Sequence, residues 1–336
     1  MVNFSVGYQF RYDSGWIDCI LLNRERVNEV FFAPLDAPNG RTGERVLKTQ
    51  FSSEDRRNIL ERDLKRISAA GIGLNILYNA GCHGSIARSS VFFKSVVETV
   101  SRYHEVYGLS SVTTTSPFVA ELLKTELPKI KVRASINMDI ASPRGMDYIS
   151  QFFDGYYLKR ELNRNMPAIR RARAWCDKNG KELLMLVNSG CLSDCSEQIF
   201  HNNLVAHGAD LIDVDRKYPI RGCRAYLQRP GKLKCLVRDT NWVRPEDLHL
   251  YDGLFDSFKL ATRVNKNPEA VLMAYVKGMY DGSILDLMEP DHSVAMNGHK
   301  LQNQLFPDGF GTRVASCNKE CERCEYCEDV FHNAYQ

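Results

Sequence analysis

The chain has 336 residues, of which 44% are hydrophobic and 25% are charged, and its formal net charge is +3. Its length supports roughly one or two domains, and its balanced charge excludes a disordered protein and a nucleic-acid binder covered by one sign of charge. The first residues lack a basic region before an apolar run, and no segment approaches ~18 consecutive apolar residues, so we expect a cytoplasmic protein without membrane insertion.

Short apolar or β-branched runs recur along the chain, and each is followed by a polar stretch compatible with a helix. Runs that are buried on both faces and alternate with helices predict parallel strands. Eight or nine such units favour a closed TIM-like (β/α)8 barrel, because no G-x-G-x-x-G follows the first strand to indicate a dinucleotide-binding sheet. The predicted strands are residues 29–33, 73–78, 110–115, 131–137, 155–159, 182–188, 210–215, 234–239 and 256–261.

Three of the intervening stretches carry clear helix signals. The first begins at a Ser52 cap and stops at Gly71, and the second begins at a Ser-Pro pair and stops before Pro128. The third, NPEAVLMAYVKGMYDG, follows the last predicted strand. We therefore expect a barrel over residues 1–265 and a C-terminal extension over residues 266–336, made of a helix and a cysteine-rich tail.

Polar residues follow several predicted strands at the point where each strand ends. The catalytic groups of (β/α)8 enzymes lie in these loops, at the C-terminal face of the barrel. We therefore expect one common mouth, formed by Asn79, Cys82, Asn137, Lys159, Arg160, Asn188, Cys191 and Arg263.

Eleven cysteines in a chain without a secretion signal predict metal ligands or catalytic thiols rather than disulfides. Cys191 and Cys195 lie three residues apart just after a predicted strand, and Cys223 and Cys235 follow them. Four thiolates are the usual ligands of a 4Fe-4S cluster and also of a structural zinc, so the pattern predicts a metal site without deciding the metal. Cys82, between two glycines, competes with Cys223 as a ligand, and packing of buried thiols is the alternative.

The C-terminal tail holds a second dense group of cysteines. Cys317, Cys321, Cys324 and Cys327 form a C-x3-C-x2-C-x2-C run, which lets one turn-rich segment surround a metal. The tail predicts a second 4Fe-4S cluster or a zinc site, and a second cluster would relay electrons to the first.

Several of these segments resemble one known family. The motifs NSGCLSDCSEQIFHNN, NWVRPEDLHLYDGLFDSFKLATR, EVFFAPLDAPNGR and YNAGC are similar to those of the U-thirty-two peptidase family. That family includes collagenase-like proteins, RNA hydroxylation factors and the paired proteins of oxygen-independent ubiquinone hydroxylation. The resemblance covers most of residues 25–285.

The resemblance implies a barrel with a 4Fe-4S cluster whose ligands would be Cys191, Cys195, Cys223 and Cys235. It also implies a redox enzyme acting on a small-molecule or RNA substrate, with prephenate as the oxygen donor in several members, and a paired family member as partner. The spacing of the first two cysteines is narrower here than in the collagenase-like branch. The extra domains of the RNA-modifying members are also lacking, so the substrate stays open.

Basic residues near predicted strand ends are candidates for the chemistry itself. Arg160, Arg244 and Arg263 could each bind a substrate carboxylate through two hydrogen bonds, and His201 or His207 could supply a proton. Arginines in ion pairs and histidines packed in the core are the alternatives. From this set we predict Arg160, Arg263 and His201 as catalytic.

Two other functions remain open from the sequence. A metal-dependent peptidase would use Glu161, Glu197 and Asp215 with His201, although their spacing matches no recognised hydrolase motif and no Ser-His-Asp or H-E-x-x-H signature is present. A non-enzymatic protein that carries a cluster for a partner is the other alternative.

Overall fold

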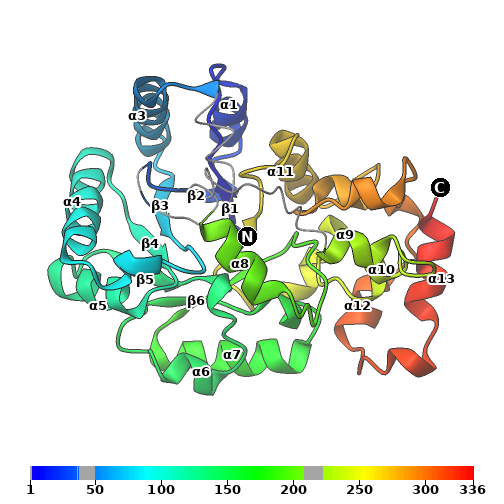
Figure 1. Ribbon diagram of the computed structural model, residues 1–336. Coiled ribbons are helices and arrows are strands. Elements are labelled where there is room, and N and C mark those ends of the chain that lie inside the picture. The colour runs from blue at the N-terminus through cyan, green and yellow to red at the C-terminus, as the bar shows by residue number, and fades with distance from the viewer. Residues whose placement is uncertain (1, 36, 38–49, 208–221) are drawn as a thin grey trace.

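The computed structural model describes residues 2–35, 37, 50–207 and 222–336. Eight parallel strands pair in chain order and close into a barrel (Figure 1), so the predicted TIM-like (β/α)8 fold is confirmed. Each strand is short and its residues are mostly buried, as expected for strands covered by helices. The strands are β1 (Phe4–Gly7), β2 (Val27–Phe32), β3 (Gly73–Tyr78), β4 (Ser111–Thr114), β5 (Lys131–Ala134), β6 (Gly155–Tyr157), β7 (Glu182–Leu186) and β8 (Ser257–Leu260).

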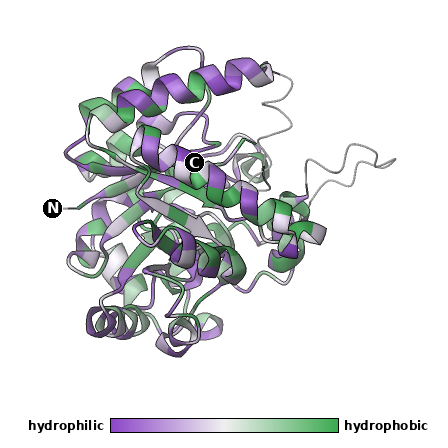
Figure 2. Ribbon diagram, turned by 90° about the vertical axis from the view of Figure 1, so that its left-hand side faces the viewer, coloured by the Kyte–Doolittle hydropathy of each residue, from purple (hydrophilic) through white to green (hydrophobic). Residues whose placement is uncertain are grey.

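Helices follow most of the strands and surround the barrel. Figure 2 shows hydrophilic and hydrophobic positions alternating along the outer helices, as expected where one helix face covers the sheet. None of the helices in the described ranges is long and apolar enough to cross a membrane. The α-helices are α1 (Gly15–Leu22), α3 (Ser53–Ala69), α4 (Ser90–Tyr107), α5 (Pro117–Glu126), α6 (Pro143–Asp147), α7 (Met166–Asn179), α8 (Gln198–Ala206), α9 (Gly222–Leu227), α10 (Cys235–Arg238), α11 (Pro268–Lys277), α12 (Phe310–Ala315) and α13 (Tyr326–Ala334).

The helix signals in the sequence are confirmed. Ser52 caps α3 by accepting a hydrogen bond from the backbone N–H of Asp55 at 3.0 Å, and Asp55 closes the reciprocal capping box. Gly71 follows α3 with a φ of +76°, a conformation that favours glycine. Helix α5 begins at Pro117, and α11 begins at Pro268.

Three predictions about strands are wrong or fall outside the described residues. Residues 234–239 form the short helix α10 instead of a strand, because a brief apolar run has the same pattern in a buried helix. The first barrel strand is β1, which was missed because it has only four residues and ends in Gly7. The predicted strand at 210–215 lies outside the described residues.

The interior of the barrel holds a buried charged pair. The carboxylate of Glu29 accepts hydrogen bonds from Ser5 at 2.9 Å, from Asn75 at 2.9 Å and from Ser111 at 3.0 Å, and it forms an ion pair with Arg133. Burial alone would raise the pKa of Glu29, but the charge of Arg133 and these hydrogen bonds hold it below its ordinary value. The buried carboxylate of Glu29 is therefore both hydrogen-bonded and paired with a cation inside the barrel.

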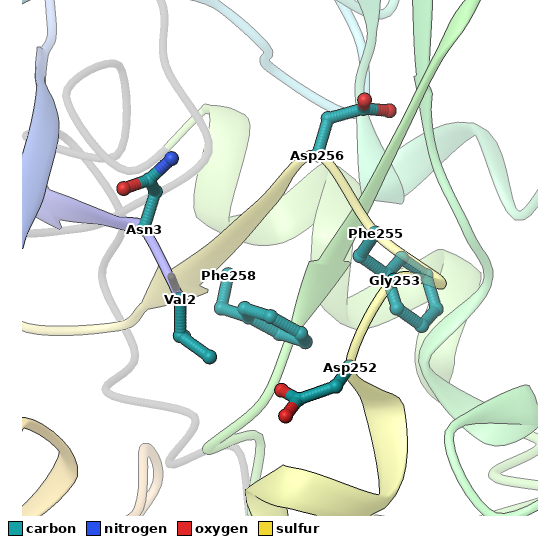
Figure 3. A pocket seen from close by; sticks show the side chains of 7 residues that line it. All are labelled: Val2, Asn3, Asp252, Gly253, Phe255, Asp256 and Phe258. Carbon is teal, nitrogen blue, oxygen red and sulfur yellow. The ribbon is translucent and has the colours of Figure 1, made fainter.

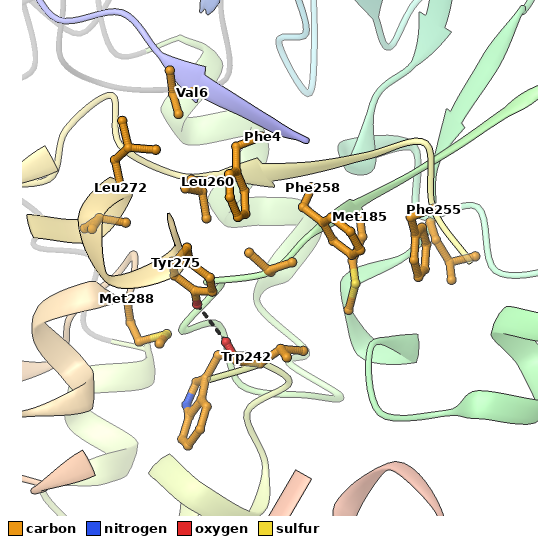
Figure 4. Packing of buried hydrophobic residues seen from close by; sticks show 14 of the residues in the cluster. Phe4, Val6, Met185, Trp242, Phe255, Phe258, Leu260, Leu272, Tyr275 and Met288 are labelled. Atoms are coloured by element: carbon orange, nitrogen blue, oxygen red, sulfur yellow. Dashed lines mark hydrogen bonds between the residues drawn. The ribbon is translucent and has the colours of Figure 1, made fainter. Parts of the chain in front are cut away.

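The C-terminal extension packs directly on the barrel. Figure 4 shows Tyr275 of α11 beside Phe4 of β1 and Leu260 of β8, with Trp242 and Met288 nearby. The hydroxyl of Tyr275 donates a 2.7 Å hydrogen bond to a backbone carbonyl of the segment that follows α10. The boundary predicted between residues 265 and 266 stays a prediction, because this apolar core continues across it.

Candidate metal centre at the barrel mouth

The longest connection of the barrel joins β7 to β8 and begins at the C-terminal end of β7. It begins with Asn188, whose side-chain amide donates to the backbone carbonyls of Ala261 at 3.1 Å and Leu287 at 2.8 Å. Asn188 thereby fixes the start of this connection to the end of β8 and to the C-terminal extension. The cysteines predicted to bind a cluster follow it.

Residues of the C-terminal extension position the loop that carries Cys191. The backbone N–H of Gly190 donates to the carbonyl of Glu289 at 3.1 Å, and Nε2 of the buried His292 donates to the carbonyl of Gly190 at 2.7 Å. A Cβ at Gly190 would lie 2.1 Å from the carbonyl oxygen of Pro290, so only glycine fits there. The extension therefore helps to build the mouth.

Three of the predicted ligands are brought together. The thiols of Cys195 and Cys223 are hydrogen-bonded to one another, and Cys191 lies within electrostatic reach of Cys223. Burial first, and then these two neighbouring sulfurs, raise the pKa of Cys223 to about 12. A metal bound there would remove this penalty, because thiolates bind metals in the deprotonated form.

The same three sulfurs do not form a site for a single ion. Within residues 2–35, 50–207 and 222–336, no three His, Cys, Asp or Glu side chains stand close enough together to hold one metal ion. In an iron-sulfur cluster each iron takes its own thiolate, so the sulfurs do not have to meet around one atom. The donor chemistry of Cys191, Cys195 and Cys223 fits a thiolate-bound metal group.

Cys235 has other contacts than these three cysteines. Its Sγ accepts a hydrogen bond from the guanidinium of Arg238 at 3.4 Å and contacts the hydroxyl of Tyr226 at 3.9 Å. Arg238 also lies within electrostatic reach of Cys321 in the tail. Cys235 therefore lies between the barrel mouth and the tail, and its predicted role as the fourth ligand stays a prediction.

Arg160, one of the predicted catalytic residues, contacts a predicted cysteine ligand. It is only 8% exposed, and it donates to Sγ of Cys191 at 3.3 Å and to Oδ1 of Asn137 at 3.1 Å. Its Nε is buried without a hydrogen-bond partner in the described part of the chain, and no described carboxylate pairs with it. A buried guanidinium with an unused N–H can bind an anionic ligand.

The other candidate residues are placed at different points. Arg263 follows β8 at the same mouth, and His201 lies in the middle of α8. Their roles stay predictions. Arg244 is structural, because it is buried against Asp247 with an Nε–Oδ2 distance of 2.7 Å and stacks on Phe306.

Cys82 does not join the three gathered cysteines. It is hydrogen-bonded to His207, which directly follows α8, whereas Cys195 precedes that helix. A helix of the length of α8 spans about 13 Å, so Cys82 and Cys195 belong to opposite ends of it. No motif in the sequence indicates the pairing of Cys82 with His207, because the two residues lie far apart in the chain.

The carboxylates proposed for a metal-dependent peptidase do not meet at one point. Glu161 is paired with Lys159 at 2.9 Å, and Glu197 is held against the backbone of Gly222. Asp215 lies outside the described residues. Nothing in the described ranges therefore assembles these side chains with His201 around a zinc.

The tail cysteines lie near one another and near a buried cation. Cys327 lies within electrostatic reach of Cys317, Cys321 and Cys324, and burial raises its pKa to about 11 against the lowering effect of Arg164. The backbone N–H of Lys319, which has a φ of +61°, donates to Sγ of Cys317 at 3.2 Å.

Arg164 was not found by sequence reasoning, since no local motif marks it. It is 4% exposed, stacks on Trp242 and Phe310, and donates to the backbone carbonyls of Val237 at 2.8 Å and Trp242 at 3.0 Å. The backbone acceptors are neutral, and the nearby Cys327 and Cys317 are among the groups whose negative charge would stabilise the Arg164 guanidinium.

A small pocket lies at the other end of the barrel from the mouth. Figure 3 shows it between the start of β1 and the turn that leads into β8, lined by Asn3, Asp252 and Phe258. Asp256 at its edge is paired with Arg173 at 2.7 Å. The N-terminal face of such a barrel usually contributes to stability rather than to chemistry.

Two known proteins are similar to this chain. A protein of Methanocaldococcus jannaschii described as "Uncharacterized protease MJ1657" is 25% identical over 266 residues, which cover 78% of this chain and 77% of that protein. The solved structure of the U32 peptidase Mk0906 matches in fold with a TM-score of 0.56 and 18% identity, covering 77% of this chain and 92% of that one. No protein-family model matches the chain. Together with the motifs, the two matches bear out the resemblance to the U-thirty-two peptidases.

Proposed function

We propose that this relative of the U-thirty-two peptidases is an iron-sulfur enzyme that performs oxygen-independent hydroxylation, or a related redox reaction, on a small or RNA-borne substrate. The observation that carries the proposal is the convergence of Cys191, Cys195 and Cys223 beside the buried Arg160 at the barrel mouth. When bound, a 4Fe-4S cluster supplies one-electron transfer and, where a protein thiolate is missing, an iron position open to substrate.

The three gathered cysteines would hold the cluster. Cys235 would complete the set only if its Sγ left Arg238 and Tyr226, its present contacts. With Cys235 in its present contacts, these three thiolates would hold the cluster, and one iron would then lack a protein thiolate. This arrangement supports a role in substrate binding beyond electron transfer.

Arg160 would position a substrate carboxylate. Asn137 and Cys191 hold its two terminal nitrogens, so its unused Nε–H has a fixed direction. Prephenate, the oxygen donor that the family resemblance implies, carries two carboxylates and is a suitable substrate for such a group. Arg263 would contact the substrate from the end of β8, and His201 would donate a proton from α8.

The tail would bind a second metal through Cys317, Cys321, Cys324 and Cys327. Two features support this proposal, namely the N–H···S hydrogen bond to Cys317 and the buried charge of Arg164 close to the sulfurs. A thiolate site carries negative charge, and a buried cation offsets it. A second 4Fe-4S cluster and a zinc both fit these contacts.

A non-enzymatic role as a cluster-bearing partner is supported by one surface feature. Ile199 and Phe200, in the first turn of α8 just after Cys195, are 74% and 67% exposed. Adjacent exposed apolar side chains beside a cluster offer a contact for a paired family member. Turnover by the isolated chain would exclude an obligate partner.

The iron and sulfide content of protein purified without oxygen tests the proposal. We expect brown protein with about four iron and four sulfide in the barrel cluster. Cys195→Ala should lose this iron, whereas the matched control Cys19→Ala, which changes a thiol of helix α1, should keep it. Colourless protein that contains only zinc, or an unchanged iron content in Cys195→Ala, would contradict the proposal.

Replacing the four tail cysteines by serine separates the two metal sites. Loss of about half of the iron indicates a second 4Fe-4S cluster. Loss of zinc with unchanged iron indicates a structural zinc. If neither metal content changes, the tail holds no metal.

A further inference from the structure

A second group of reactive side chains lies at the mouth, away from the gathered cysteines. The loop after β3 carries Cys82, whose Sγ accepts a hydrogen bond from the backbone N–H of Gly84 at 3.2 Å and is hydrogen-bonded to His207. Gly84 has a φ of +55°, and a Cβ there would lie 3.1 Å from Cε1 of His207. The loop is therefore shaped to bring the thiol against the imidazole.

The thiol of Cys82 differs from the packed thiols of the chain. Its hydrogen bonds with His207 and with the N–H of Gly84 hold its pKa below the ordinary value of a cysteine. Burial instead raises the pKa of Cys19, and it raises the pKa of Cys176 to about 11. A partly exposed thiol held toward the thiolate form is a nucleophile.

His83 supplies a third group beside this pair. It is 9% exposed, its ring packs 5.7 Å from that of Phe92, and its Nε2 is buried without a hydrogen-bond partner in the described residues. Burial first, and then the nearby His207, lower its pKa, so the ring is neutral at pH 7. A neutral imidazole with an unused nitrogen can donate one hydrogen bond to a ligand in the tautomer that carries the proton on Nε2.

The three side chains do not form a metal site. Cys82, His83 and His207 are not among any group of three ligands that could hold one ion in the described residues. Their chemistry is instead that of a thiol activated by an adjacent base. Because the pair lies at the end of α8 opposite Cys195, this chemistry does not need the cluster.

We propose that Cys82 and His207 form a nucleophilic site for ester or amide substrates, with His83 as the donor to the carbonyl oxygen. Sγ attacks the carbonyl carbon, a C–S bond forms, and the carbonyl electron pair moves to the oxygen. The electron pair returns, the bond to the alkoxide or amine breaks, and the leaving group takes a proton from His207. Water then attacks the thioester, gives a proton to His207 and releases the acid and the thiolate.

Alkylation by iodoacetamide tests the thiolate. The full chain, purified without oxygen, is treated with iodoacetamide at pH 6 to 9, and each cysteine is followed by mass spectrometry after digestion. We expect Cys82 to react at least about tenfold faster than Cys19 at pH 7, because its contacts favour the thiolate whereas burial disfavours the thiolate of Cys19. His207→Gln should remove this advantage.

Acylation by 4-nitrophenyl acetate tests the carbonyl chemistry. We expect nitrophenolate release with a transient acetyl group on Cys82, and neither in Cys82→Ala. His83→Gln should slow acylation about tenfold or more but leave iodoacetamide alkylation unchanged, because alkylation develops no oxyanion.

These readouts are independent of the proposed redox function. Iron content and the far-ultraviolet spectrum of each variant control for folding and for the cluster. Equal alkylation of Cys82 and Cys19 at pH 7 would overturn the proposal, and so would the absence of an acetyl group on Cys82. Alkylation without acylation would mark Cys82 as a thiol that reacts with oxidants or alkylating agents and would likewise overturn the acyl-transfer assignment.

Discussion

Two arginines of the barrel are equally buried and are used in opposite ways. Arg133 on β5 is 9% exposed and Arg160 after β6 is 8% exposed. Arg133 is ion-paired with Glu29 and with Glu182, the second pair at 2.7 Å. Arg160 has only a thiol and an amide oxygen as acceptors.

The difference in pairing distinguishes an arginine that stabilises the fold from one that is proposed to bind a ligand. A buried charge costs several kcal/mol unless it is paired or hydrogen-bonded. Arg133 lies within the barrel wall, where its charge is fully neutralised. Arg160 lies at the mouth, where the anionic substrate proposed above would complete its contacts.

The largest expected effect comes from breaking the paired arginine. Arg133→Met leaves the carboxylate of Glu29 buried without its cation, which should lower the free energy of unfolding by about 3–5 kcal/mol. Equilibrium unfolding in urea measures it. The double variant Glu29→Gln/Arg133→Met removes both charges and should recover most of the loss, and a single variant as stable as the parent would contradict the structural role.

Removing Arg160 should change stability little and ligand binding strongly. Arg160→Met loses no ion pair, so its unfolding free energy should change by less than about 1 kcal/mol, with iron content unchanged. Binding of prephenate, measured by calorimetry, should weaken about 10- to 100-fold, the worth of one or two hydrogen bonds to a charged group. Strong destabilisation with unchanged binding would reverse the assignment of the two arginines.

The pattern of apolar runs was sufficient to predict most of the barrel. Residues 73–78 were predicted as a strand with the same bounds as β3, because six largely apolar residues flanked by turns leave little ambiguity. The prediction of a strand at residues 234–239 was wrong, because α10 is short and buried and its apolar pattern fits both a strand and a helix. The pattern of a few apolar residues does not determine whether they form a short buried helix or a strand.

The candidate site was predictable only where its residues are close in sequence. Cys191 and Cys195 were found from their spacing after a strand, and Arg160 from its position at a strand end. The direction of Cys235 depends on α10, which was predicted as a strand, so its contacts with Arg238 were not foreseen. The pairing of Cys82 with His207 depends on how the β7–β8 connection crosses the mouth.

The pH dependence of stability tests whether Glu29 causes the deficit of Arg133→Met. The pKa of Glu29 in the folded chain lies below its ordinary value of about 4.3. Its contribution to stability is therefore complete above pH ~4.3 and is lost as the pH falls through the folded pKa. In Arg133→Met the lowering effect of the cation is lost while burial still raises that pKa, so the deficit of the variant should shrink as the pH falls from about 7 to 4. Urea midpoints across this range measure it, and a deficit that stays constant would exclude Glu29 as its source.

The smallest effect is expected at a third basic residue, which shares a carboxylate with Arg133. Nζ of Lys131 lies 2.6 Å from Oε1 of Glu182, while Nε of Arg133 lies 2.7 Å from Oε2. The side chain of Lys131 is 56% exposed, so water replaces the ion pair when it is lost, and Lys131→Ala should cost at most about 1 kcal/mol of unfolding free energy. Added salt should reduce even this difference, because exposed pairs are screened. A loss as large as that of Arg133→Met would mean that pairing with Glu182, and not burial of the guanidinium, decides how much each cation contributes.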